Sequence, residues 1–147
     1  MLRQIILLFT LALVLTDAVS QTEITWETLS DVRFTDKYYE EEGDYYLFPN
    51  FGSSVKELEG KEVFLRGYIL AIDPEVGYYL LSSNPYASCF FCGNAGPETV
   101  VELSFKSKQR KLKMDQLVTI IGRLKLNDDN VYQCNYIFED HKLYDSD

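Results

Sequence analysis

The chain has 147 residues, of which 46% are hydrophobic and 14% aromatic, and its formal net charge is −9 at pH 7. This length suits one globular domain around a single hydrophobic core, and the composition excludes general disorder. A net negative surface repels phosphate backbones and anionic lipid headgroups, so we expect no nucleic-acid partner.

The first 20 residues have the features of a cleaved secretory signal. Arg3 precedes an apolar run over residues 5–15, and residues 18–20 (Ala-Val-Ser) place small side chains at the two positions that a signal peptidase reads. The run is shorter than the ~20 apolar residues that a membrane span needs. We therefore predict a signal peptide over 1–20, a mature chain without membrane insertion, and a periplasmic or secreted location.

Residues 21–58 are expected to form an extension whose short helices pack on the main domain. Trp26 and Leu29 are three residues apart, and Thr25 before them is a suitable N-cap. This pattern predicts a short helix in which Trp26 anchors the core. Further on, Ser54 and Glu57 have the spacing of a capping box and predict a second helical turn.

Between these two turns lies an acidic, tyrosine-rich stretch over residues 36–49. It has no clean periodicity and predicts an extended segment that wraps the domain. Its carboxylates lack the ligand spacing of a calcium loop, which favours a solvated acidic surface.

Five strands are predicted within residues 59–140, at 61–72, 78–81, 98–105, 116–126 and 131–139. Gly67 interrupts the first strand and favours a bend, so that one strand can join both halves of a closed barrel. In the third strand Glu102 alternates with apolar neighbours and is expected to face solvent. The fold class is therefore all-β, a five-stranded OB-fold-like barrel with one or two short peripheral helices.

The C-terminal part of the chain contains a basic segment, the last predicted strand and a polar tail. Residues 106–113 hold five basic side chains, which favour a solvated connector between strands over an anion-binding patch. In the fifth strand Cys134 alternates with Tyr132 and Tyr136, which predicts that all three face the core. Residues 141–147 are polar and predict a tail in which His141 is exposed.

A cysteine pair between the second and third strands is the candidate site. Cys89 and Cys92 have the Cys-x-x-Cys spacing, and Gly93 follows them. This spacing lets two thiolates bind one ion from a tight turn, and glycine after the second cysteine can take a positive φ. Cys134 is the candidate third ligand, and His141 would complete a Cys₃His set, so zinc is the expected cofactor.

Other chemistry remains open at this pair. Cys89 and Cys92 could form a disulfide, or either could pair with Cys134, with one thiol left over in each case. A thioredoxin-like redox pair is disfavoured, because such pairs begin a helix and Pro97 with its neighbouring glycines opposes one. Phe90 and Phe91 are expected to form a hydrophobic plug under the loop.

Three blocks carry a family resemblance: residues 60–68, the cysteine block 84–98 with its Cys-Phe-Phe-Cys-Gly-Asn-Ala-Gly-Pro-Glu core, and residues 118–124. They resemble a family of small, secreted, uncharacterised bacterial OB-fold proteins. They are also similar to a wider group of periplasmic OB-like domains with a cysteine-bearing loop after the second strand, some associated with metal transport. This resemblance implies a secreted barrel and identifies no catalytic residue.

Two hypotheses for the function follow. The first is a non-enzymatic, monomeric extracytoplasmic binding module that binds a transition metal, zinc, through Cys89, Cys92 and Cys134. The second is a structural or protein-interaction OB-fold domain in which the cysteines form a disulfide or only pack, and a surface contacts a protein partner. An enzyme is disfavoured, because the sequence holds no nucleophile motif and no phosphate-binding glycine loop.

Overall fold

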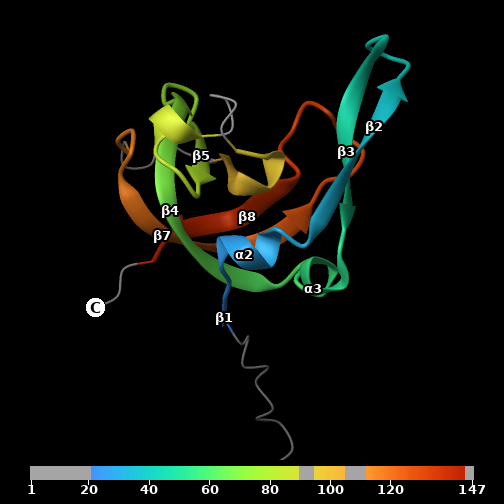
Figure 1. The fold of residues 1–147 in the computed structure, drawn as a ribbon. Helices are drawn as coiled ribbons and strands as arrows, with labels where there is room; N and C mark the ends of the chain where they lie inside the picture. Colours follow the sequence, from blue (N-terminus) through green and yellow to red (C-terminus); the bar gives the residue numbers. More distant parts are fainter. Residues whose placement is uncertain (1–20, 90–94, 105–111, 145–147) are drawn as a thin grey trace, which may run out of the picture.

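Five strands close into a barrel at the centre of the computed structural model, which describes residues 21–89, 95–104 and 112–144 (Figure 1). The barrel strands are β4 (Glu62–Asp73), β5 (Tyr78–Ser82), β6 (Val100–Ser104), β7 (Leu117–Leu126) and β8 (Tyr136–Leu143). The predicted signal peptide over 1–20, Cys92 with both phenylalanines of its loop, and residues 106–111 of the basic segment lie outside the described residues.

The strand order is β4-β5-β6-β8-β7, and β7 pairs back onto β4. Strands β6 and β8 are parallel, whereas the other barrel neighbours are antiparallel. This is the strand order of an OB-fold, so the predicted OB-fold-like barrel is confirmed. A short strand, β1 (Thr22–Glu23), adds to β4 in parallel.

Strand β4 joins both halves of the barrel, as the sequence predicted. Its first part, from Glu62 to Tyr68, pairs with β7, and its second part, from Tyr68, pairs with β5. Gly67 lies at this change of partner, where an added Cβ would come within 2.6 Å of the Ser82 carbonyl oxygen and 2.9 Å of the Trp26 ring. Glycine is therefore required here by close approach.

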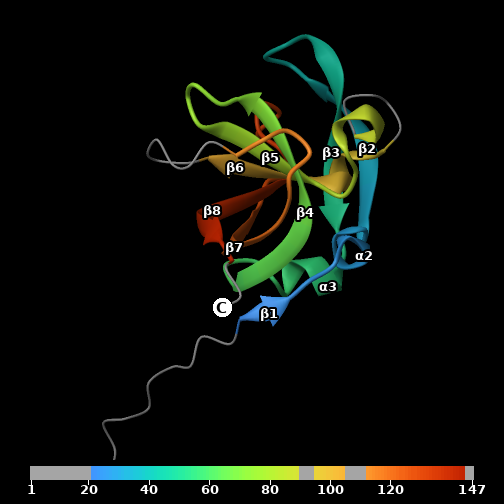
Figure 2. The same cartoon turned by 90° about the vertical axis from the view of Figure 1, so that its left-hand side faces the viewer.

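Two short helices lie at one end of the barrel, the lower end in Figures 1 and 2. The first, α2 (Trp26–Leu29), begins as predicted, with the Thr25 hydroxyl accepting a hydrogen bond from the Thr28 N–H. Trp26 packs against the core and donates its indole N–H to the Arg66 carbonyl at 2.8 Å. Leu29 is fully buried in the same core.

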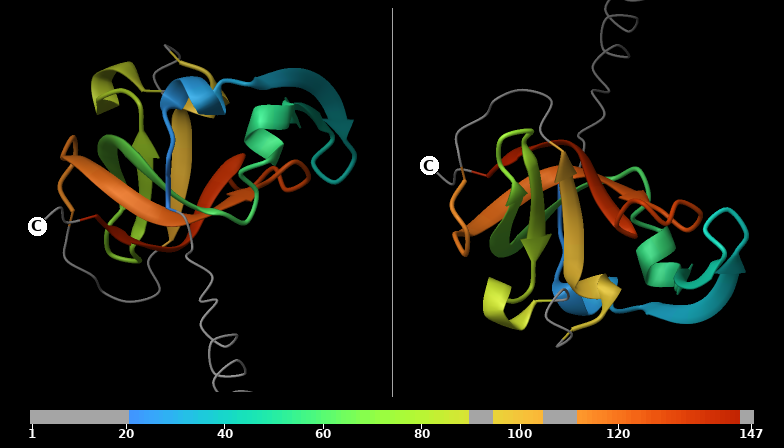
Figure 3. Two further views of the ribbon diagram at one scale, coloured as in Figure 1. Left: turned by 90° about the horizontal axis from the view of Figure 1, so that it is seen from below. Right: turned by 90° about the horizontal axis from the view of Figure 1, so that it is seen from above.

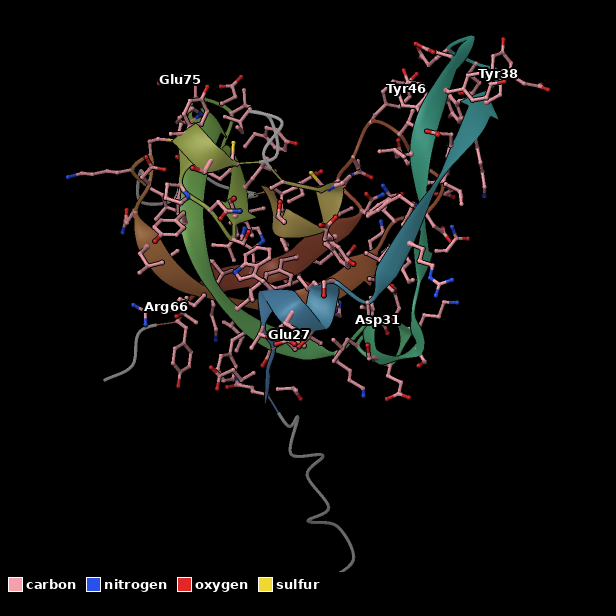
Figure 4. All side chains as sticks on the ribbon, viewed as in Figure 1. Glu27, Asp31, Tyr38, Tyr46, Arg66 and Glu75 are labelled. Atoms are coloured by element: carbon pink, nitrogen blue, oxygen red, sulfur yellow. The ribbon has the colours of Figure 1, made fainter. Side chains whose placement is uncertain are left out.

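The second helix, α3 (Ser53–Lys56), forms without the predicted capping box. Its N-cap is Gly52, which has no side chain to accept a hydrogen bond, and the Asp31 carboxylate takes this role from outside the helix. It accepts hydrogen bonds from the Ser54 N–H at 3.2 Å and the Ser54 hydroxyl at 2.5 Å. Figure 4 shows Asp31 beside this turn. The capping-box prediction is wrong because a long-range carboxylate replaced the local pair.

Strands β2 (Val32–Tyr39) and β3 (Asp44–Phe51) form a separate two-stranded hairpin over the stretch predicted to wrap the domain. In Figure 1 this hairpin stands out from the barrel, so the prediction of a wrapping segment is wrong. Edge-to-face contacts between tyrosines of the two strands hold it together, with ring centroids 5.4 Å apart for Tyr38 and Tyr45. Aromatic cross-strand pairs of this kind stabilise a hairpin.

The main core fills the barrel and extends under α2 and α3. Its residues alternate along each strand with residues of the outer face; for example, Tyr79 and Leu81 belong to the core and Leu80 between them does not. Tyr136 is fully buried and donates its hydroxyl to the Leu29 carbonyl at 2.6 Å, which ties β8 to α2. No helix among the described residues is long and apolar enough to cross a membrane.

Candidate functional site

A second, smaller hydrophobic cluster lies on the outer face of β4 and β5, and it contains the described cysteines. Leu70, Leu80 and Cys89 are fully buried there, and Tyr78 and Cys134 pack against them. Cys89 comes from the loop after β5, whereas Cys134 comes from the β7–β8 loop, 45 positions further along the chain. The fold therefore brings two of the three predicted ligands to one cluster.

The described structure does not place the other candidate ligands, Cys92 and His141, in this cluster. Cys92 lies outside the described residues. Among the residues that are described, no three His, Cys, Asp or Glu side chains come together as a metal-binding group. His141 lies on β8 and its Nδ1 donates a hydrogen bond to the Phe138 carbonyl at 2.8 Å.

His141 is half-buried within β8, which continues to Leu143, so the prediction of an exposed histidine in a polar tail is wrong. Residues 140 and 141 form a bulge opposite Gly122, and Asp140 takes a positive φ of 48° there. Desolvation lowers the pKa of the His141 imidazole, and the Phe138 and Asp140 contacts oppose this shift.

Strand β8 begins at Tyr136, five residues later than predicted, because the loop before it is held by side-chain bonds. The buried Asn127 amide donates to the carbonyls of Asn130, Gln133 and Cys134 at 2.8, 3.2 and 3.1 Å. Those carbonyls are therefore not available for a strand ladder. Tyr132 is consequently 67% exposed instead of facing the core, and Cys134 turns to the outer cluster.

Glu102 on β6 is the residue that sequence patterning missed. It was expected to face solvent, yet it is only 5% exposed because the β7–β8 loop covers it. Its carboxylate accepts the Cys134 backbone N–H at 3.0 Å and the Gln133 side-chain amide at 3.4 Å. Among the described residues no basic side chain forms an ion pair with it. A polar residue on an outward strand position carries no signal that a distant loop will bury it.

Burial in the cluster, together with the nearby Glu102 carboxylate, favours the protonated forms of Cys134 and Tyr78. Burial, reinforced by the charge of Glu102, raises the pKa of the Cys134 thiol to about 12, although a hydrogen bond with Tyr78 opposes the shift. Burial and the neighbouring Cys134 and Glu102 likewise raise the pKa of Tyr78 to about 12. At neutral pH both groups are protonated, so the Cys134 thiol is unreactive unless a cation joins it.

A groove of about 480 Å³ opens next to the thiol cluster. It lies between the β2–β3 hairpin and the β7–β8 loop, which are side by side in both panels of Figure 3. Cys134 and Tyr78 line its inner end. OB-folds commonly bind ligands on the face of their second and third strands, flanked by the loop between the fourth and fifth. The thiol cluster and the groove occupy the corresponding place here.

The comparisons with known proteins place the chain by fold. It is similar to the crystal structure of a DUF3299 family protein from Pseudomonas aeruginosa, with a TM-score of 0.51 and 18% identity over 87% of this chain and 99% of that one. At this identity the likeness shows the fold alone. No protein-family model matches the chain, and no curated protein does. The class that the fold defines is thus a small OB-fold-like barrel, which agrees with the resemblance to uncharacterised barrel proteins.

Proposed function

We propose that this protein is a non-enzymatic, exported binding module that binds one transition metal ion through Cys89, Cys92 and Cys134. Zinc is the expected metal. The observation that supports it is the placement of Cys89 and Cys134 in one cluster from separate loops. Cys92 enters through its sequence spacing to Cys89. Three thiolates around one point at about 2.3 Å suit Zn²⁺, which prefers sulfur and nitrogen ligands in a tetrahedron.

The pKa of Cys134 explains how such a site would respond to pH. A bound dication supplies the positive charge that the cluster lacks, and it favours the thiolate that burial and Glu102 disfavour. Binding then releases the thiol protons, so the apparent affinity for zinc falls as the pH falls. Export, for which the apolar run over residues 5–15 is the support, would place this site outside the cytoplasm.

Elemental analysis of protein purified without chelator tests the proposal. We expect about one zinc per chain in the wild type and none in a Cys89→Ser, Cys92→Ser variant. The matched control is Ser88→Ala, which changes an exposed side chain in the same loop and should retain zinc. Equal and negligible zinc in the wild type and the double variant would overturn the proposal.

A second candidate is a structural or interaction domain with inert thiols, and the raised pKa of Cys134 favours it. Thiol counting on unreduced, denatured, metal-stripped protein separates the alternatives. Three reactive thiols agree with a metal site or with packed cysteines, whereas one reactive thiol indicates a disulfide. The zinc content then distinguishes a metal site from packed cysteines.

A further inference from the structure

One long edge of the β2–β3 hairpin faces the groove. Consecutive residues of β3, from Tyr45 to Pro49, all line it. Because successive side chains of a strand point to opposite faces, a run of neighbours that lines one groove means that the strand edge faces it. Strand β3 pairs with β2 alone among the described strands, and Tyr45 to Pro49 make no backbone-to-backbone hydrogen bond outside this pairing within the described residues. The Tyr45 N–H donates to the Asp44 carboxylate at 2.7 Å, and Pro49 has no N–H. The groove side of β3 therefore has no partner strand, and it offers backbone carbonyl oxygens with fewer N–H donors.

The groove is also rich in exposed aromatic rings. Tyr45 and Tyr132 are each 67% exposed and Leu47 is 50% exposed. Tyr45 and Leu47 line the groove from the hairpin, and Tyr132 lines it from the β7–β8 loop. Tyr132 donates a hydrogen bond to Glu42, which links the β7–β8 loop to the outer end of the hairpin. Figure 4 shows Tyr38 and Tyr46 at this outer end as well. Apolar and aromatic surface that gathers around a groove is typical of an interaction site.

The charge around the groove is negative. Between Val32 and Phe51 five acidic residues stand against two basic ones, and Asp128 and Asp129 add two more acids from the β7–β8 loop. Glu102 lies buried behind the inner end of the groove, next to Cys134. A second copy of the chain would bring the same acids against each other, so repulsion disfavours a homodimer through this surface.

These rings can also hold a cation. Within the hairpin the Lys37 ammonium already lies 5.1 Å from the centroid of the Phe48 ring. Tyrosine rings attract lysine and arginine side chains in the same way. The free strand edge therefore favours a ligand with an extended backbone, and the aromatic rings and acidic side chains favour a ligand with basic side chains.

We propose that the groove binds an extended basic segment of a partner protein, which adds as a strand to the free edge of β3. Its backbone pairs with the edge, and its lysine or arginine side chains lie on Tyr45 and Tyr132 near Asp128. The site meets the proposed metal site at Cys134 but is otherwise separate, because the peptide would contact the hairpin and the exposed part of the β7–β8 loop.

Binding of a labelled (Lys-Val)₄ peptide, measured by fluorescence anisotropy, tests this. We expect saturable binding that weakens with salt, and much weaker binding of a (Glu-Val)₄ peptide. A Tyr45→Ala, Tyr132→Ala variant should bind at least tenfold more weakly, corresponding to the roughly 1.4 kcal/mol or more that two rings supply. Tyr144→Ala, an exposed tyrosine that does not line the groove, is the matched control.

Hydrogen exchange identifies the mode of binding. Strand addition should slow amide exchange within Tyr45–Phe48, whereas nonspecific attraction to an acidic surface would leave it unchanged. No binding, equal binding to the groove variant, unchanged exchange, or self-association that the same variant abolishes would each overturn the proposal. Repeating the titration with the Cys89→Ser, Cys92→Ser variant keeps the two proposals separate, since peptide binding should persist without the metal ligands.

Discussion

Glu102 shows how one side chain can add to the effect of burial on its neighbours. Its side chain points outward from the strand, but the β7–β8 loop covers it, and the Cys134 N–H donates a hydrogen bond to its carboxylate. A buried carboxylate beside the partly buried Cys134 thiol disfavours the thiolate, because two negative charges in surroundings of low polarity repel each other. Burial is the main reason that the Cys134 thiol stays protonated, and Glu102, a residue expected to face solvent, reinforces it.

We expect Glu102→Gln to lower the pKa of Cys134. The substitution removes the charge that reinforces burial and keeps a side chain of the same shape, so the thiolate fraction at a given pH rises. The measurement is the pH dependence of alkylation in a Cys89→Ser, Cys92→Ser background, where Cys134 is the remaining thiol. An alkylation profile that does not move with Glu102→Gln would contradict this electrostatic role.

At the scale of elements, the β7–β8 loop is organised by Asn127 instead of by turn residues. One buried amide binds three carbonyls of the loop, and its oxygen accepts the Asn130 N–H at 3.0 Å. These bonds place Cys134 in the outer cluster and Tyr132 in the groove. The predicted strands at 116–126 and 131–139 left four residues between them, whereas the loop runs from residue 127 to residue 135, because the Asn127 side chain competes for the backbone groups that a strand would pair.

Asn127→Ala should destabilise the protein by about 2–3 kcal/mol, because it removes the hydrogen bonds that one buried amide makes to three loop carbonyls. The measurement is the free energy of unfolding from urea denaturation. Asp128→Ala, an exposed neighbour in the same loop, is the control and should change stability by less than about 0.5 kcal/mol. Equal effects of the two substitutions would show that Asn127 does not organise the loop.

For the whole molecule, several buried groups favour their protonated forms. The pKa values of Cys134 and Tyr78 are raised to about 12, and burial also raises the pKa of the Tyr136 hydroxyl. An unfolded chain releases these protons at lower pH than the folded chain does. The stability that the protonated groups contribute is therefore complete below the ordinary pKa of each group and is lost as the pH rises.

We accordingly expect the free energy of unfolding of metal-free protein to fall as the pH rises from about 9 to about 12. Cys134 alone contributes a slope of at most about 1.4 kcal/mol per pH unit. Denaturant melts at several pH values measure this, and Cys134→Ala should flatten the fall. A stability that stays constant or increases over this interval would contradict the assigned protonation states.

Much of the barrel was readable from the chain alone. Runs of apolar, strand-favouring residues marked four of the five strands to within a few residues, and Gly67 marked the strand that changes partners. The helix after Thr25 was also readable, since its cap is three residues away.

The tertiary structure decided the contacts between residues that are far apart in sequence. Asp31 caps α3, the β7–β8 loop buries Glu102, and Cys89 and Cys134 belong to one cluster on the outer face. The hairpin edge faces a groove that four separate segments create. None of these contacts leaves a periodic pattern or a motif spacing in the sequence, because each one forms only when closure of the barrel brings distant loops together.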